Sequence, residues 1–195
     1  MHKKDNISLF GQKKSRKPNL RKIALLFFMS LTLGSCSNDD DNNSSQSLPP
    51  ETQTGANTVG CLVNGKVFLP HKEGINAPVN CFYQFVDDEF YFTMAFSDLR
   101  NGGIETVNIF TTATELEQDQ TYILNQGYTP ILGGGAEYYL KLSNKFSTNT
   151  TQTGELTITR NDLSNSIISG IFWFDAINEA GEVVKIREGR FDWNY

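Results

Sequence analysis

The chain has 195 residues and a net charge of −5, and 12% of its residues are aromatic. The charge is divided unevenly: residues 1–35 hold 8 of the 17 Lys and Arg residues and one of the 22 Asp and Glu residues, which leaves a net charge of −12 on the rest. A chain this acidic lacks the clustered basic surface of nucleic-acid-binding proteins, so we expect no nucleic-acid partner and no electrostatic docking on anionic headgroups.

The first element is an apolar run, IALLFFMSLTLG at residues 23–34, which follows a strongly basic stretch. A helix needs about 20 apolar residues to span a bilayer, so this run is too short. A basic region, a short apolar region and small residues after it are typical of a secretory signal peptide. The alternative, a buried helix of a cytosolic domain, is disfavoured because the polar tract that follows has nothing apolar to pack against it.

The end of this run, Leu33-Gly34-Ser35-Cys36, resembles the lipobox of bacterial lipoproteins. The resemblance implies that residues 1–35 are removed as a lipoprotein signal peptide, and that Cys36 is linked through its sulfur to diacylglycerol and acylated on its new amine. Each buried methylene contributes about 0.8 kcal/mol, so two or three acyl chains anchor a domain to the membrane without a transmembrane helix. The alternative is an ordinary cleaved signal with an incidental cysteine.

Residues 36–56 are nearly free of apolar side chains and predict a disordered tether, because they cannot offset the entropy of ordering. The acidic run at residues 39–41, separated from Cys36 by two residues, resembles the lipoprotein export signal of Bacteroidota. This resemblance implies an outer-membrane lipoprotein that is displayed on the cell surface. A domain that faces inward is the alternative.

From residue 57 to residue 195, apolar and polar residues alternate and turn residues recur at short intervals. This pattern predicts an all-β domain, either an antiparallel β-sandwich or a small β-barrel. We expect one helical turn at residues 114–118. The glycine runs Gly102-Gly103 and Gly133-Gly134-Gly135 lack the strand–glycine–helix context of phosphate loops, and we interpret them as flexible loops.

Two hairpins are predicted early in the domain. Asn64-Gly65 is a strong signal for a two-residue turn, because both residues tolerate positive φ, and it pairs Val63 with Lys66 and Cys61 with Phe68. A second turn at Asp87-Asp88 gives a face that we expect in the core, made of Cys81, Tyr83, Phe85, Phe90, Phe92 and Met94. The opposite face, which is either half-exposed or covered by a second layer, then holds Phe82, Gln84, Glu89, Tyr91 and Thr93.

A third hairpin is predicted from residues 168–176 to residues 183–186, with its turn at residues 178–181. The chain ends in RFDWNY at residues 190–195, whose period of two predicts a strand that is built into the sheet. Residues 154–160, the Ser169-Gly170 strand and the terminal GRFD strand resemble the closing strands of uncharacterised Bacteroidota lipoproteins, and residues 60–70 resemble their opening strand pair. The resemblance implies a small β domain and assigns no functional residues.

With Cys36 lipidated, Cys61 and Cys81 remain. An even pair in an exported domain favours a disulfide, which would stabilise the fold by about 3 kcal/mol. Two reduced, buried cysteines are the alternative. The single histidine after Cys36, His71, follows Pro70 in a predicted surface loop and cannot build a multi-histidine zinc site. We interpret Asp87-Asp88-Glu89 as a solvated turn rather than a calcium site, so no metal and no cofactor is predicted.

The aromatic content favours a non-catalytic binding or interaction module with a glycan or protein ligand. Its candidate binding aromatics are Tyr83, Tyr91, Tyr138, Tyr139 and Trp173. One alternative is a structural accessory protein of the envelope. Another is a carboxylate-based glycan hydrolase, which needs two acids across a cleft and would draw on Glu155, Asp175 and Asp192.

Overall fold

A computed structural model of the chain describes residues 46–100, 104–126, 133–141 and 143–195. The predicted signal peptide, Cys36, the acidic run at residues 39–41 and Gly102-Gly103 lie outside the described residues. Within them the chain is all-β, as predicted, and its eleven strands form one mixed sheet.

The strands follow one another along the chain, and the last two, β10 and β11, are the longest. Their bounds are β1 (Thr58–Val63), β2 (Lys66–Phe68), β3 (Val79–Val86), β4 (Glu89–Asp98), β5 (Glu105–Thr112), β6 (Thr121–Gln126), β7 (Gly133–Leu140), β8 (Asn144–Ser147), β9 (Gly154–Asp162), β10 (Ile167–Ile177) and β11 (Val183–Asn194).

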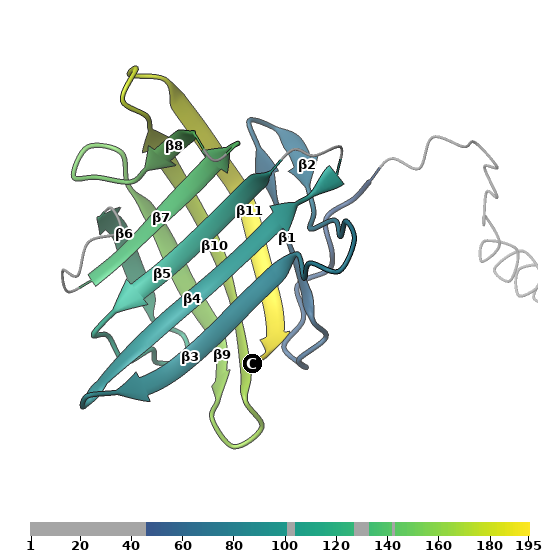
Figure 1. The fold of residues 1–195 in the computed structure, drawn as a ribbon. Coiled ribbons are helices and arrows are strands. Elements are labelled where there is room, and N and C mark those ends of the chain that lie inside the picture. The colour runs from purple at the N-terminus through teal and green to yellow at the C-terminus, as the bar shows by residue number, and fades with distance from the viewer. Residues whose placement is uncertain (1–45, 101–103, 127–132, 142) are drawn as a thin grey trace, which may run out of the picture. The chain divides into compact units, whose positions relative to one another are not determined.

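The strand order is β2-β1-β11-β10-β9-β6-β7-β5-β4-β3, and β8 pairs with β7 and β10. All pairs are antiparallel except β6 with β7. The sheet curls into a barrel-like shape (Figure 1). The end strand β2 approaches β4, the neighbour of the other end strand β3: the rings of Phe68 and Phe96 lie 5.6 Å apart, and His71 forms a backbone bridge with Asp98.

Large apolar side chains fill the interior of the barrel. Phe92, Phe96 and Phe174 are fully buried, and Phe172 and Phe191 are only 3% exposed. Burying each such side chain stabilises the fold by about 1.5–3 kcal/mol. The interior is therefore a packed core, and ligand contacts must be sought on the outside of the sheet.

The two early hairpins form as predicted. Asn64 and Gly65 have φ of 48° and 80°, and Cys61 pairs with Phe68. Asp87 and Asp88 also adopt positive φ, which fixes the register of β3 and β4. On the predicted core face of this second hairpin, Tyr83, Phe92 and Met94 are buried, and Cys81 and Phe90 are half-buried. Phe85 is 59% exposed, so its core prediction is wrong, because it sits beside the turn and beyond the packed interior.

The third hairpin and the terminal strand also form as predicted. Ile177 pairs with Val183 across the turn at residues 178–181. The terminal residues belong to β11, which lies between β1 and β10. The C-terminal end of the chain is therefore built into the sheet.

Two loop predictions are wrong. Gly133, Gly134 and Gly135 begin β7, and the absence of side chains on the last two lets β6 approach closely: a Cβ on Gly134 would lie 2.9 Å from the carbonyl oxygen of Ile123. Residues 114–118 form no helical turn, because Leu116 is buried and its N–H donates to the Tyr83 hydroxyl at 2.8 Å.

Residues 46–56, which we call the strap, lie against the domain although composition predicts a disordered tether for residues 36–56. The buried carboxylate of Asp192 accepts hydrogen bonds from the backbone N–H groups of Thr54, Gly55 and Ala56 at 2.8–3.1 Å. It also accepts one from the Thr52 hydroxyl at 2.7 Å. The strap is thus held by polar contacts with a distant strand, which its own lack of apolar residues does not reveal.

Candidate functional site

The five candidate binding aromatics divide between the two faces of the sheet. Tyr83 and Tyr138 point into the barrel and are each 5% exposed. Tyr91, Tyr139 and Trp173 lie half-exposed on the outside of the sheet. The structure therefore leaves the last three available to a ligand.

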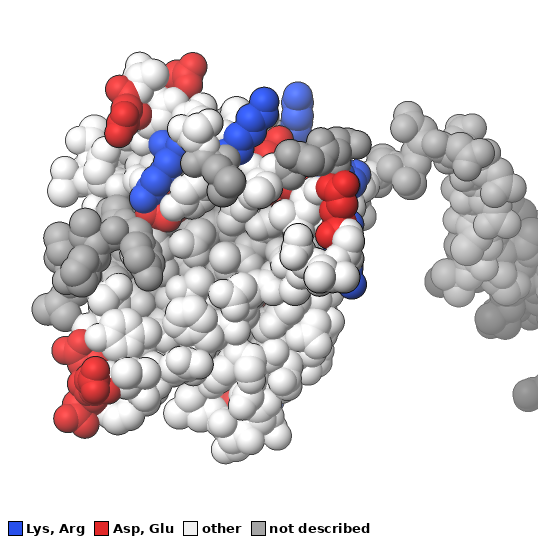
Figure 2. Space-filling view, viewed as in Figure 1, with Lys and Arg blue, Asp and Glu red and all other residues white. Residues whose placement is uncertain are grey.

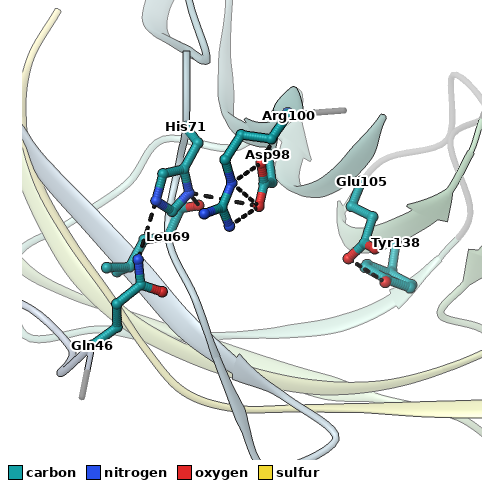
Figure 3. Close-up of polar contacts among 7 residues, drawn as sticks. All are labelled: Gln46, Leu69, His71, Asp98, Arg100, Glu105 and Tyr138. Carbon is teal, nitrogen blue, oxygen red and sulfur yellow. Dashed lines mark hydrogen bonds and ion pairs between the residues drawn. The ribbon is translucent and has the colours of Figure 1, made fainter. Parts of the chain in front are cut away.

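Tyr83 and Tyr138 serve the interior. Tyr83 accepts a hydrogen bond from the N–H of Leu116, and burial raises the pKa of its hydroxyl. Tyr138 donates to Glu105 at 3.1 Å (Figure 3), and burial together with the Glu105 carboxylate raises the pKa of its hydroxyl well above the usual range. Neither tyrosine can contact a ligand on the outer surface, so neither is part of a binding site there.

A groove of about 330 Å³ crosses the outer face of β3, β4, β5 and β7. We call it the aromatic groove, and its lining residues are Asn80, Phe82, Thr93, Ala95, Thr106, Asn108, Glu137 and Tyr139. Strand register explains why these residues meet: Ala95 pairs with Asn108, which pairs with Glu137, and Thr106 pairs with Tyr139. The same register places Phe82 in line with Gly135 of β7, four residues along that strand from Tyr139, so Phe82 and Tyr139 mark diagonally opposite corners of the groove.

Tyr139 is held in position by its neighbours. Its hydroxyl donates to Glu137 at 2.7 Å, and the Lys145 ammonium lies 2.6 Å from the other oxygen of that carboxylate and 5.8 Å from the centre of the tyrosine ring. Glu137 is only 2% exposed, so this ion pair is shielded from solvent on its acidic side. The ring of Tyr139 is therefore a fixed wall of the groove rather than a mobile side chain.

The floor of the groove is polar and carries no charge apart from the paired Glu137. Asn80, Thr93, Thr106 and Asn108 supply amides and hydroxyls, and the buried Oδ1 of Asn108 has no hydrogen-bond partner among the described residues. Buried polar atoms without a partner are uncommon. Figure 2 shows this face as largely uncharged, with Lys, Arg, Asp and Glu gathered toward its margins.

Trp173 lies elsewhere, on the outer face of β10. Its indole N–H donates to Glu155 of β9 at 3.2 Å. The guanidinium of Arg187 lies over its ring at 5.2 Å from the centre. Tyr91 is also outside the aromatic groove, where its hydroxyl donates to Glu89 at 3.2 Å. Of the five predicted binding aromatics, only Tyr139 lines the aromatic groove.

His71 follows β2 in a loop, as predicted, but it is not free. Its Nδ1 lies 2.9 Å from the carbonyl oxygen of Leu69 and 3.6 Å from the carboxylate of Asp98 (Figure 3). Arg100 donates from Nε to Asp98 at 2.9 Å, and this hydrogen bond lowers the pKa of Asp98. These contacts join the ends of β2 and β4, so His71 has a structural role.

Cys61 and Cys81 are both free thiols in the structure, which does not contain the predicted disulfide. Cys61 is fully buried on β1, and Cys81 is half-buried on β3. No strand pairing joins these two strands, which lie near opposite ends of the strand order. Burial raises the pKa of the Cys81 thiol to about 12 and that of Cys61 further, which opposes formation of the reactive thiolates.

Each acid considered for a hydrolase has a partner. Burial opposes ionisation of Asp192, but hydrogen bonds from Thr52, Ser169 and the strap backbone outweigh it and hold its pKa well below the usual range. Asp175 lies 2.6 Å from the guanidinium of Arg187, and Glu155 accepts from the indole. Asp192 is 1% exposed, so it cannot contact a surface substrate.

Several residues of the groove were not predicted as site residues: Asn80, Phe82, Asn108 and Glu137. Alternation along β3 does place Phe82 on the outer face, and that was the available signal. Asn80 lies on the same strand, whereas the other polar members come from β4, β5 and β7, and only the strand order brings them together.

The described part of the chain contains no group of three or more His, Cys, Asp or Glu side chains placed to hold a metal. Nor does it contain a helix long and apolar enough to cross a bilayer. Comparison with curated proteins and with solved structures gives no match. The family model described as a domain of unknown function, DUF6252, matches residues 82–192, more than half of the chain. The chain belongs to this family.

Proposed function

We propose that this protein is a lipid-anchored lipoprotein of the outer membrane, displayed on the cell surface, and that it acts as a non-catalytic module that binds neutral glycans in the aromatic groove. The observation that carries the ligand class is a groove on an acidic domain whose one charged lining residue, Glu137, is paired with Lys145. Its aromatic walls, Phe82 and Tyr139, stand over a floor of amides and hydroxyls.

The chemistry of the groove suits a sugar. Aromatic rings pack against the C–H faces of sugar rings, while a few placed polar groups orient the hydroxyls. The fixed ring of Tyr139 would lose little entropy on binding. A sugar hydroxyl could donate to the unpartnered amide oxygen of Asn108 after a small rotation of that amide. A groove with these features favours ligand binding over the alternative of a purely structural accessory protein, which would present a flat apolar patch.

The anchor and its orientation rest on the sequence. The lipobox ending at Cys36 supports lipidation, and the acidic run at residues 39–41 supports export to the surface. The strap begins at residue 46, so few residues separate the proposed lipid from the folded domain. A binding module on such a tether would hold its ligand close to the membrane surface.

Binding is tested with the full lipoprotein in detergent on a panel of neutral and acidic oligosaccharides, followed by calorimetry of any neutral hit. We expect Phe82→Ala and Tyr139→Ala each to weaken binding about tenfold, because each removes one aromatic wall. Phe85→Ala is the matched control, since it removes an exposed ring of the same strand outside the groove. Unchanged affinity in both groove variants, or equal loss in the control, would refute the glycan proposal.

Location is tested by protease treatment of intact cells that also carry a periplasmic control protein. We expect digestion of this domain while the control survives. Replacing residues 39–41 by asparagine should retain the domain inside, and Cys36→Ser should abolish labelling by a radioactive fatty acid. Protection of the wild-type domain in intact cells would refute surface display and leave the glycan proposal to be judged by calorimetry alone.

A further inference from the structure

We propose that the protein has a second ligand site, on the outer face of β9, β10 and β11, which binds the basic side chain of a lysine or arginine in a partner peptide. We call it the Trp173 shelf. It comprises two adjoining hollows of about 250 and 150 Å³ that share Glu51, Ile171 and Arg190. This site is separate from the aromatic groove and does not depend on the function proposed for that groove.

The shelf has an apolar floor. Ile171 and Trp173 point outward along β10 on either side of the buried Phe172, and Ile171 is 37% exposed. Glu155 lies directly across from Trp173 on β9, and Glu188 lines the other side of the larger hollow from β11. An indole flanked by carboxylates is the chemistry that attracts organic cations, through the ring face and through ion pairing.

The strap completes the shelf. Pro50, Glu51, Thr52 and Gln53 form one wall of the smaller hollow. That wall is fixed because the Thr52 hydroxyl and the neighbouring backbone donate to Asp192. The Arg160 side chain also donates to the carbonyl of Gln53. The site therefore combines residues from both ends of the described chain.

The charged side chains around the shelf favour a cationic ligand. The guanidinium of Arg187 is matched by Asp175 at 2.6 Å, so this pair adds no net charge. Arg190 is shared between Glu51 at 3.7 Å and Glu188 at 3.4 Å. Glu155 accepts the indole N–H, a neutral donor.

The carboxylates of Glu51, Glu155 and Glu188 are therefore balanced only by the single positive charge of Arg190, and the shelf carries about two excess negative charges at neutral pH. An anionic ligand such as a phosphate or an acidic sugar would be repelled. The stacking of Arg187 on Trp173 shows within the protein that this indole takes a guanidinium on its face. A lysine or arginine side chain, with an apolar stem and a charged head, fits both the floor and the rim.

The test uses the full lipoprotein in non-ionic detergent with Trp193→Phe, which leaves Trp173 as the single tryptophan of the chain. The probes are the blocked tripeptides acetyl-Gly-Lys-Gly-amide and acetyl-Gly-Arg-Gly-amide, with acetyl-Gly-Gln-Gly-amide as the neutral control. We expect a saturable change in Trp173 fluorescence with the two basic peptides and none with the neutral one. Added salt should weaken the binding, because the carboxylates are exposed to solvent.

Glu155→Gln removes the charge but keeps an acceptor for the indole N–H, and we expect it to weaken binding about threefold. The matched control is Glu179→Gln, because Glu179 is an exposed acid in the β10–β11 turn and does not line the shelf. It should leave the affinity for basic peptides unchanged. Equal binding of the glutamine peptide, no saturable response, or an unchanged affinity in Glu155→Gln would overturn the proposal. Circular dichroism of each variant separates loss of binding from loss of fold. Sugar binding in the aromatic groove is read by calorimetry on other variants, so either site can fail without the other.

Discussion

Ser169 and Asp192 face each other across β10 and β11, and the Ser169 hydroxyl donates to the buried Asp192 carboxylate at 2.7 Å. The same register pairs Gly170 with Phe191 and Phe172 with Gly189. The two short sequence patterns that suggested a lipoprotein family, SG at residues 169–170 and GRFD at residues 189–192, are therefore cross-strand partners. Their residues fit one another and also provide the acceptor that holds the strap.

Asp192→Asn should destabilise the domain by about 2–3 kcal/mol, because the strap donors lose a charged acceptor while one amide oxygen remains to accept. For a domain of this size the melting temperature should fall by roughly 5–10 °C. The measurement is thermal unfolding followed by circular dichroism. Asp88→Asn, in the exposed turn where asparagine also tolerates positive φ, is the matched control and should leave the melting temperature unchanged.

The same substitution should release the strap locally. Limited proteolysis of Asp192→Asn under native conditions should cut within residues 46–56, whereas the wild-type chain should resist there. Because Glu51 belongs to the strap, the variant should also weaken the binding of basic peptides to the Trp173 shelf. A strap that stays resistant in the variant would show that Asp192 does not hold it.

The stability contributed by Asp192 should depend on pH in a defined direction. Its pKa is lowered in the folded state, so at acid pH the unfolded chain binds a proton that the folded chain does not. The contribution is complete above the unfolded-state value of about 4 and declines as the pH falls below it. Urea unfolding at pH 7 and pH 3 should show a smaller difference between wild type and Asp192→Asn at pH 3. An equal difference at both values would contradict the assignment.

Gly170→Ala should destabilise the domain by about 1–3 kcal/mol through overpacking. A Cβ at this position would lie 2.7 Å from the carbonyl oxygen of Thr157 and 2.8 Å from the ring of Phe191, which is itself packed in the core. A crystal structure of Gly170→Ala should show the Phe191 ring displaced. The comparison variant is Ser169→Gly at the neighbouring position, which removes a hydrogen bond without adding bulk. Urea unfolding with unchanged stability for Gly170→Ala would mean that the backbone shifts more freely than this packing allows.

Local chemistry made much of the fold predictable. Asn64-Gly65 and Asp87-Asp88 specify their turns through positive φ, and each turn then sets the register of the strands beside it. The strap was not predictable in this way, because Gly55 and its acceptor Asp192 are 137 positions apart in the sequence. Composition reports whether a segment can bury apolar surface, but it carries no information about a buried carboxylate elsewhere in the chain.

The site was only partly predictable for a related reason. The two-residue repeat of a strand predicts that Tyr138 and Tyr139 face opposite sides of the sheet. Which of the two faces outward depends on the register of β7 with β5 and β8. Phe82 and Tyr139 become opposite walls of one groove only because β4 and β5 lie between β3 and β7. That strand order is not sequential, since β6 is inserted elsewhere, so no local pattern contains it.

The oxidation state of Cys61 and Cys81 can be measured, because the sequence favours a disulfide whereas the structure contains two free thiols. If Cys61 and Cys81 are free, alkylation with iodoacetamide in denaturant without reductant should add a group to each, whereas a disulfide would block both. In the native state both should react slowly, because Cys61 is fully buried and burial raises the pKa of each thiol. Mass spectrometry of the protein isolated from the envelope under acid quench reads the result directly. Alkylation of neither residue without reductant and of both after reduction would establish the disulfide and require β1 and β3 to lie closer than they do here.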